Sequence, residues 1–149
     1  MIRVVVQDAP IDLAAEHALA EAADAGAVAT FTGLVRGDDG VTELALEHYP
    51  GATERALERL CEQAVERWAL AKAVIVHRVG PMVPGDRVVF VATTARHRGA
   101  ALEACAFLID RLKTGAPFWK RERRGADARW VEARDSDDVA AARWGDGVR

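Results

Sequence analysis

Short β-branched segments recur in pairs along this 149-residue chain, and this pairing restricts its fold more than any other feature. Residues 71–80 and 87–95 flank the turn 83–86, and residues 27–36 and 41–49 flank a Gly- and Asp-rich loop. Connections this short force neighbouring strands to run antiparallel, because a parallel pair needs a long crossover. The pattern predicts hairpins and an α+β fold, and it argues against a doubly wound nucleotide-binding architecture.

Helical segments separate the strand pairs. The apolar side chains after Thr53 recur at helical spacing, which indicates a long amphipathic helix that buries one face. Asp12 is a suitable cap for an earlier helix ending near Gly26. The remaining predicted elements are a strand at 2–7, a helix at 98–115, a last pair of strands at 118–123 and 128–133, and a short helix from Ser136.

Composition indicates one compact domain covering residues 1–149, with 50% hydrophobic residues and 29% charged ones. The net charge of -3 argues against general nucleic-acid binding. The N-terminus lacks the pattern of a signal peptide, and no apolar run reaches the roughly 20 residues that span a bilayer. Cys61 and Cys105 lie far apart in predicted helices, so we expect free thiols and a cytoplasmic protein without membrane association.

Residues 111–124 are rich in Lys and Arg and contain one acidic residue, Glu122. A local cationic site within an acidic protein suits a small anion better than a polyanion. Lys113 by itself has an ordinary explanation, the negative end of a helix dipole, and Lys120 by itself is typical of a solvated strand residue. The Gly/Pro turn between them suggests that both amines reach one pocket, where neighbouring cations lower a lysine pKa.

Two further segments are candidates for anion binding. His97 and Arg98 fall where a strand meets a helix, and backbone N–H groups at a helix start attract anions. A capped helix with surface arginines explains them equally well. Arg36 ends a predicted strand and could form bidentate hydrogen bonds to a phosphate, although a loop arginine is the simpler interpretation.

We predict no metal and no cofactor. Neither cysteine has metal-binding spacing, and the four histidines are scattered along the chain: His17, His48, His77 and His97. We interpret His48 and His77, which fall in strands, as structural.

Several blocks of sequence resemble the molybdopterin synthase catalytic (large) subunit family. They occur in family order from about residue 27 onward, and Lys113-Thr-Gly-Ala-Pro-Phe-Trp-Lys-Arg-Glu122 is the most specific of them. The other blocks are Phe31–Arg36, Leu46–Gly51, Val76–Gly80, Pro84–Asp86, Ala95–Arg98 and Trp130–Arg134.

The resemblance implies a sulfurtransferase of molybdenum cofactor biosynthesis. Such an enzyme converts cyclic pyranopterin monophosphate to molybdopterin with two sulfurs from the C-terminal Gly-Gly thiocarboxylate of a small ubiquitin-like subunit. It also implies a homodimer at the centre of a heterotetramer. The implied fold is α+β of the α/β-hammerhead type, with an antiparallel sheet and an additional small β-subdomain.

The resemblance also implies which residues form the site. Lys113 and Lys120 match the family's active-site lysines, and we expect the first to meet the sulfur tail and the second to act beside the pterin. The matched substrate-binding positions are Leu34, Val35, Arg36, His97, Arg98, Lys113, Lys120, Arg121, Glu122 and Arg134. Arg134 matches a basic residue that serves the neighbouring protomer's site.

Two other classes of function compete with this interpretation. Phe118, Trp119 and the basic run could form a stacking platform for single-stranded nucleic acid, which the acidic net charge disfavours. A non-catalytic scaffold that only docks a ubiquitin-like partner would not need both lysines or the His97-Arg98 pair.

Overall fold

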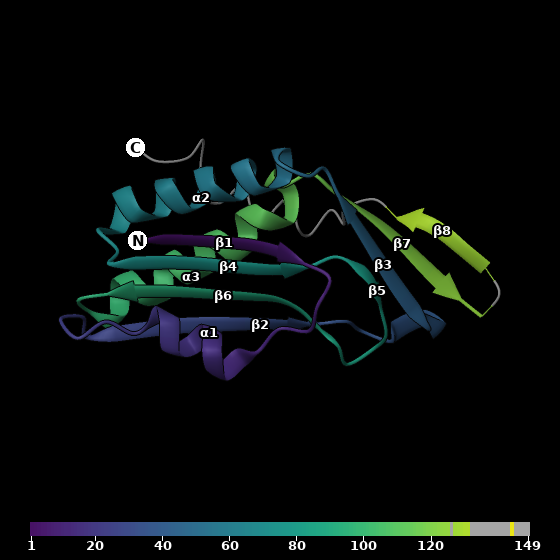
Figure 1. Ribbon diagram of the computed structural model, residues 1–149, viewed down its shortest axis with the longest axis horizontal. Helices are drawn as coiled ribbons and strands as arrows, with labels where there is room; N and C mark the ends of the chain where they lie inside the picture. The colour runs from purple at the N-terminus through teal and green to yellow at the C-terminus, as the bar shows by residue number, and fades with distance from the viewer. Residues whose placement is uncertain (126, 132–143, 145–149) are drawn as a thin grey trace.

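The strands of this computed structural model, which describes residues 1–125, 127–131 and 144, form two four-stranded sheets (Figure 1). The predicted mixed α+β class is confirmed. In the first sheet the strand order is β1 (Ile2–Gln7), β4 (Lys72–Arg78), β6 (Arg87–Ala95) and β2 (Ala27–Leu34). In the second sheet it is β5 (Gly80–Met82), β3 (Glu43–His48), β7 (Phe118–Arg124) and β8 (Asp127–Val131).

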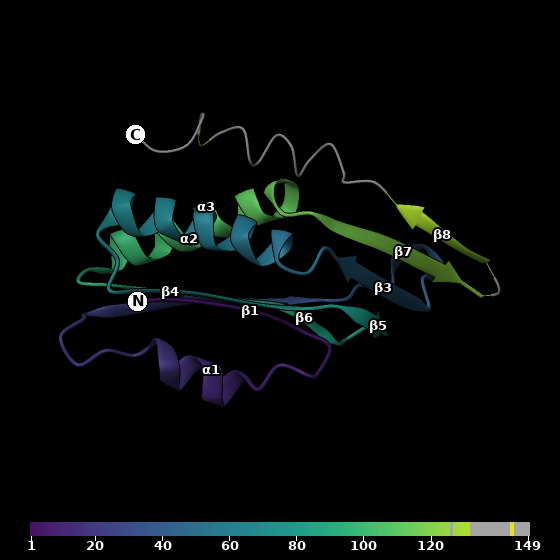
Figure 2. The same ribbon diagram turned by 45° about the horizontal axis from the view of Figure 1, so that its top comes forward.

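Helices cover both faces of the first sheet. The helices α2 (Ala52–Trp68) and α3 (Arg98–Gly115) pack side by side on one face, and α1 (Leu13–Ala20) lies on the other, as Figure 2 shows. Residues 73–76 of β4 are fully buried. A strand covered on both faces must be apolar at every position, which explains the continuous run Ala-Val-Ile-Val.

The predicted hairpin of residues 27–49 is wrong, because its two strands belong to different sheets. The strand β2 pairs with β6, whereas β3 pairs with β5 and β7. The turn at 83–86 causes the separation: the Val35 N–H donates to the Asp86 carbonyl, and the Gly85 N–H donates to the Val35 carbonyl, both at 2.9 Å. Beyond Val35 the chain passes through a short 3-10 helix, Asp38–Gly40, and enters the second sheet.

The predicted hairpin of β4 and β6 is confirmed as an antiparallel pair. The first sheet nevertheless departs from a purely antiparallel arrangement, because β1 runs parallel to β4. The long chain segment between these two strands, which includes α1 and α2, allows that pairing.

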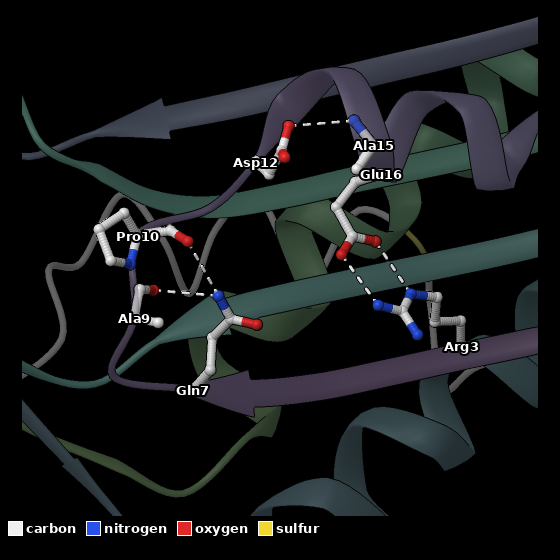
Figure 3. Close-up of polar contacts among 7 residues, drawn as sticks. All are labelled: Arg3, Gln7, Ala9, Pro10, Asp12, Ala15 and Glu16. Atoms are coloured by element: carbon white, nitrogen blue, oxygen red, sulfur yellow. Dashed lines mark hydrogen bonds and ion pairs between the residues drawn. The ribbon is translucent and has the colours of Figure 1, made fainter.

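The helix α1 is shorter than predicted, although Asp12 caps its start as expected (Figure 3). Lys72 Nζ donates to the carbonyls of Leu19 and Glu21 at 2.8 and 2.7 Å, and these bonds replace the next helical turn. Arg3 on β1 forms two hydrogen bonds of 2.9 Å with Glu16, which fix α1 to the sheet (Figure 3).

The last predicted strand pair is confirmed as β7 and β8. The expected helix from Ser136 lies outside the described residues. Within the described part of the chain, no helix has the length and apolar character needed to cross a membrane.

Candidate functional site

A short connector joins α3 to β7 and carries a candidate lysine on each side. Lys113 is exposed in the last turn of α3, and Lys120 is the third residue of β7. The buried Thr53 hydroxyl, at the start of α2, donates to the Pro117 carbonyl at 2.9 Å and accepts from the Tyr49 N–H at 3.0 Å. The connector is therefore held in place by the segment that leads from β3 into α2.

The first residue of β7 is also fixed from the first sheet. The Phe118 ring stacks on the His77 imidazole of β4, with centroids 4.1 Å apart and 25° between the planes. His77 is buried, and its Nδ1 lies 2.9 Å from the Arg78 carbonyl. Since a carbonyl only accepts, Nδ1 carries the proton of the neutral ring.

Burial is the main reason that the pKa of His77 falls from 6.5 to about 4, and the nearby charges of Lys113 and His48 lower it further. The imidazole is therefore neutral at pH 7. The end of α3 lies close to the junction between the two sheets, because α3 ends at Gly115 and Phe118, three residues later, stacks on His77.

The register of β7 decides which of its side chains share a face. Phe118 lies opposite His48, Lys120 opposite Leu46, and Glu122 opposite Leu44. Since side chains alternate along a strand, these three residues of β7 lie on the face of the buried leucines. Arg121 was expected beside Lys120 and Glu122, but the alternation places it on the opposite face, with Trp119.

Arg36 and its neighbours follow β2 at the same end of the first sheet. Val35 is buried, whereas Leu34 is 56% exposed. Arg36 is also exposed, and its Nε lies 3.6 Å from an Asp38 carboxylate oxygen. Because β2 runs antiparallel to β6, Arg36 lies near the start of β6. The C-terminal end of α3 lies at this same end of the first sheet, because α3 follows β6 and runs back along it.

His97 and Arg98 lie at the opposite end of α3 from Lys113. Both are exposed, and the His97 side chain makes no capping hydrogen bond. Fifteen residues separate Arg98 from Lys113, which at about 1.5 Å per residue is roughly 22 Å along the helix. Within one chain the structure does not bring them together. The last predicted site residue, Arg134, lies outside the described residues.

Thr53, Phe118 and His77 support the candidate lysines. Reasoning from the sequence treated them as a helix start, part of a stacking platform and a structural histidine, and did not connect them with the lysines. The local signal for His77 was a histidine directly after the apolar run 73–76 of β4. Other chemistry finds little support here: in the part of the chain that the structure describes, no three His, Cys, Asp or Glu side chains gather as metal ligands. Burial raises the pKa of Cys61 to about 12 and that of Cys105 to about 11, so neither is a ready nucleophile.

Comparisons with known proteins agree with the resemblance. The family described as MoaE protein matches residues 6–115. The molybdopterin synthase catalytic subunit of Escherichia coli K12 is 49% identical over 146 residues, covering 95% of this chain and 97% of that protein. The corresponding subunit of Ralstonia nicotianae is 50% identical over 145 residues, covering 94% of this chain and 82% of that protein.

Solved structures lead to the same family. The molybdopterin biosynthesis MoaE protein of Burkholderia ambifaria is 49% identical with a TM-score of 0.84, covering 97% of this chain and 99% of that one. The molybdopterin synthase of Staphylococcus aureus is 31% identical with a TM-score of 0.80, covering 87% and 96%. A family match over most of the chain and relatives near 50% identity lead to one conclusion: this chain belongs to the MoaE family, whose curated relatives are molybdopterin synthase catalytic subunits.

Proposed function

We propose that this chain is the catalytic subunit of a cytoplasmic molybdopterin synthase and that residues 1–149 act as one domain. It converts cyclic pyranopterin monophosphate to molybdopterin by inserting two sulfurs. The sulfur donor is the thiocarboxylated C-terminus of a small ubiquitin-like subunit, and two copies of the chain form the centre of a heterotetramer.

One structural observation supports the catalytic role of the two lysines. The connector between Lys113 and Lys120 is held by the Thr53–Pro117 hydrogen bond and by the His77–Phe118 stack. A rigid connector keeps two amines in a constant relation to each other, and catalysis by positioned groups requires that. A charged surface loop without such contacts would not support the same conclusion.

Lys113 and Lys120 have different roles in this proposal. Lys113 orients the anionic thiocarboxylate, which enters as an extended tail. Lys120 acts as a general acid/base where oxygen leaves the pterin side chain and sulfur enters. Glu122, on the same face of β7 as Lys120, and the segment Leu34-Val35-Arg36 complete the pterin site, with Arg121 contributing from the other face.

The phosphate is held by cations, and a second copy of the chain supplies some of them. His97 and Arg98 are roughly 22 Å from Lys113 along α3, at about 1.5 Å per helical residue, so they cannot serve the same chain's lysines. In a dimer they serve the partner's lysines instead, and Arg134 acts in the same way. Preorganised cations of this kind stabilise the negative charge exposed when the cyclic phosphate opens.

Reconstitution tests the proposal. The purified chain, the thiocarboxylated small subunit and cyclic pyranopterin monophosphate are combined, and the molybdopterin formed is measured. We expect product only when all three are present. A chain that binds the small subunit but forms no molybdopterin would be a docking scaffold, and the proposed activity would be wrong.

A further inference from the structure

The contact between His77 and Phe118 links the two sheets at the N-terminal end of β7. His77 belongs to β4 of the first sheet, and Phe118 is the first residue of β7. Their rings are nearly parallel at 4.1 Å between centroids, and the 2.9 Å hydrogen bond from Nδ1–H to the Arg78 carbonyl fixes the plane of the imidazole. An aliphatic side chain could fill this space but could not set the plane of the phenyl ring.

Phe118 is also the residue at which the ladder between β7 and β3 begins. It lies directly opposite His48. The His48 Nε2 lies 3.6 Å from one Glu54 oxygen, and the other Glu54 oxygen accepts from the Gly51 N–H at 2.7 Å. Both neighbours of the phenyl ring are therefore anchored, one in the first sheet and one by the start of α2.

Register at this pair decides where Lys120 points. Side chains alternate along a strand, so a slip of one residue would exchange the two faces of β7. Lys120 would then move to the opposite face of β7, which Trp119 and Arg121 now occupy. A residue that fixes Phe118 thereby fixes the direction of Lys120, two residues further along the same face.

We infer that His77 is a positioning residue for the sulfur-transfer reaction: by stacking on Phe118 it sets the register of β7 and holds Lys120 in a fixed relation to Lys113. This inference rests on the proposed function of the two lysines. His77 itself does not touch the substrate.

The test compares three variants in the reconstituted enzyme with saturating pterin and thiocarboxylated small subunit. His77→Leu removes the flat ring, His77→Phe keeps a flat ring, and Val76→Ala is the matched control. Val76 is a fully buried neighbour on β4 whose side chain packs in the separate core cluster beneath α1. Turnover is expressed per folded molecule, at a temperature well below every variant's unfolding transition.

We expect His77→Leu to lower kcat by about 10- to 100-fold, since a misplacement of about 1 Å can cost that much. The KM for the small subunit should stay within about threefold, because the docking surface is unchanged. His77→Phe should retain kcat within about threefold, and Val76→Ala should match the wild type. Amide hydrogen exchange in β7 should accelerate in His77→Leu and not in Val76→Ala.

A second variant keeps the test decisive if His77→Leu does not fold. Phe118→Leu removes the other ring of the stack, and it should lower kcat to the same extent. Where both variants fold, the double variant should be no slower than either single one, because both changes break the same contact.

The outcomes separate the inference from the proposed function. A wild-type chain that makes no molybdopterin overturns both. A competent wild type with equal kcat per folded molecule in His77→Leu and Val76→Ala overturns the positioning role alone. Equal loss in His77→Phe and His77→Leu also overturns it, since the imidazole and not the stack would then be required.

Discussion

The two sheets differ in what covers them. The first sheet has helices on both faces, and most side chains of β4 and β6 are buried. The second sheet buries Leu44 and Leu46 on one face of β3. On the other face of β3, Ala45 is buried, but Glu47 is exposed beside the half-exposed Trp119. The first sheet therefore holds most of the buried core, whereas the proposed site lies where the second sheet meets it.

Removing Lys113 should produce the largest effect on activity and almost none on stability. For Lys113→Ala we expect turnover to fall at least about 100-fold, as for loss of a positioned acid/base or charge-stabilising group. The free energy of unfolding should change by less than about 0.5 kcal/mol, because the side chain is exposed. Molybdopterin formation and urea denaturation measure the two quantities.

Two controls sharpen that experiment. Lys120→Arg should not sustain turnover, because Lys120 is the proposed general acid/base and a guanidinium stays protonated, whereas Lys113→Arg keeps the charge that orients the thiocarboxylate. Arg59→Ala removes an exposed cation from α2 and should leave turnover unchanged. A fully active Lys113→Ala enzyme would remove this lysine from the proposed site.

A core substitution beside the first sheet should have the opposite effect: it should lower stability and leave turnover unchanged. Leu57 of α2 is fully buried against the first sheet. Leu57→Ala should lower the free energy of unfolding by about 2–5 kcal/mol and leave kcat per folded molecule near the wild-type value. Urea denaturation followed by assays at low temperature checks both parts, and a large loss of kcat would contradict the division between the two regions.

Acidification should weaken the seam between the sheets. His77 has a pKa of about 4 in the folded chain and about 6.5 when unfolded, so the unfolded chain binds the proton first as the pH falls. Its stabilising contribution is complete above pH 6.5 and is lost progressively between pH 6.5 and 4, by up to about 3 kcal/mol.

Urea denaturation at several pH values between 7.5 and 4 measures this loss. In His77→Phe the loss over the same window should be smaller, because no group at position 77 then takes up a proton. Identical pH profiles for the wild type and this variant would show that the imidazole does not cause the loss.

The smallest expected effects on stability come from removing two polar contacts in and beside the second sheet. Thr53→Val removes the hydroxyl between Tyr49 and Pro117 and should cost about 1–3 kcal/mol, because buried partners lose their hydrogen bonds. Glu43→Gln weakens a partly exposed 3.5 Å ion pair with Arg123 and should cost less than about 1 kcal/mol. Equal costs, measured by urea denaturation, would mean that the connector is not held by Thr53.

Much of the fold could be read from local pattern. Helical spacing after Thr53, the cap at Asp12 and the hairpin around residues 83–86 depend on neighbours in sequence, and the structure confirms all three. The predicted hairpin of residues 27–49 failed because hydrogen bonds between Val35 and the distant turn at 83–86 redirect the chain. Local pattern contains no information about such a contact.

The features of the candidate site also divide into those that the sequence predicted and those that only the tertiary structure decided. The sequence by itself determined which side chains are available, the family to which they belong, and that a short Gly/Pro connector links Lys113 to Lys120. Only the tertiary structure decided that Arg121 and Lys120 face opposite ways, that α3 separates His97 and Arg98 from Lys113, and that His77 stacks on Phe118. Spacing along a chain fixes relations within one helix or strand, whereas register and packing between elements depend on residues far apart in sequence.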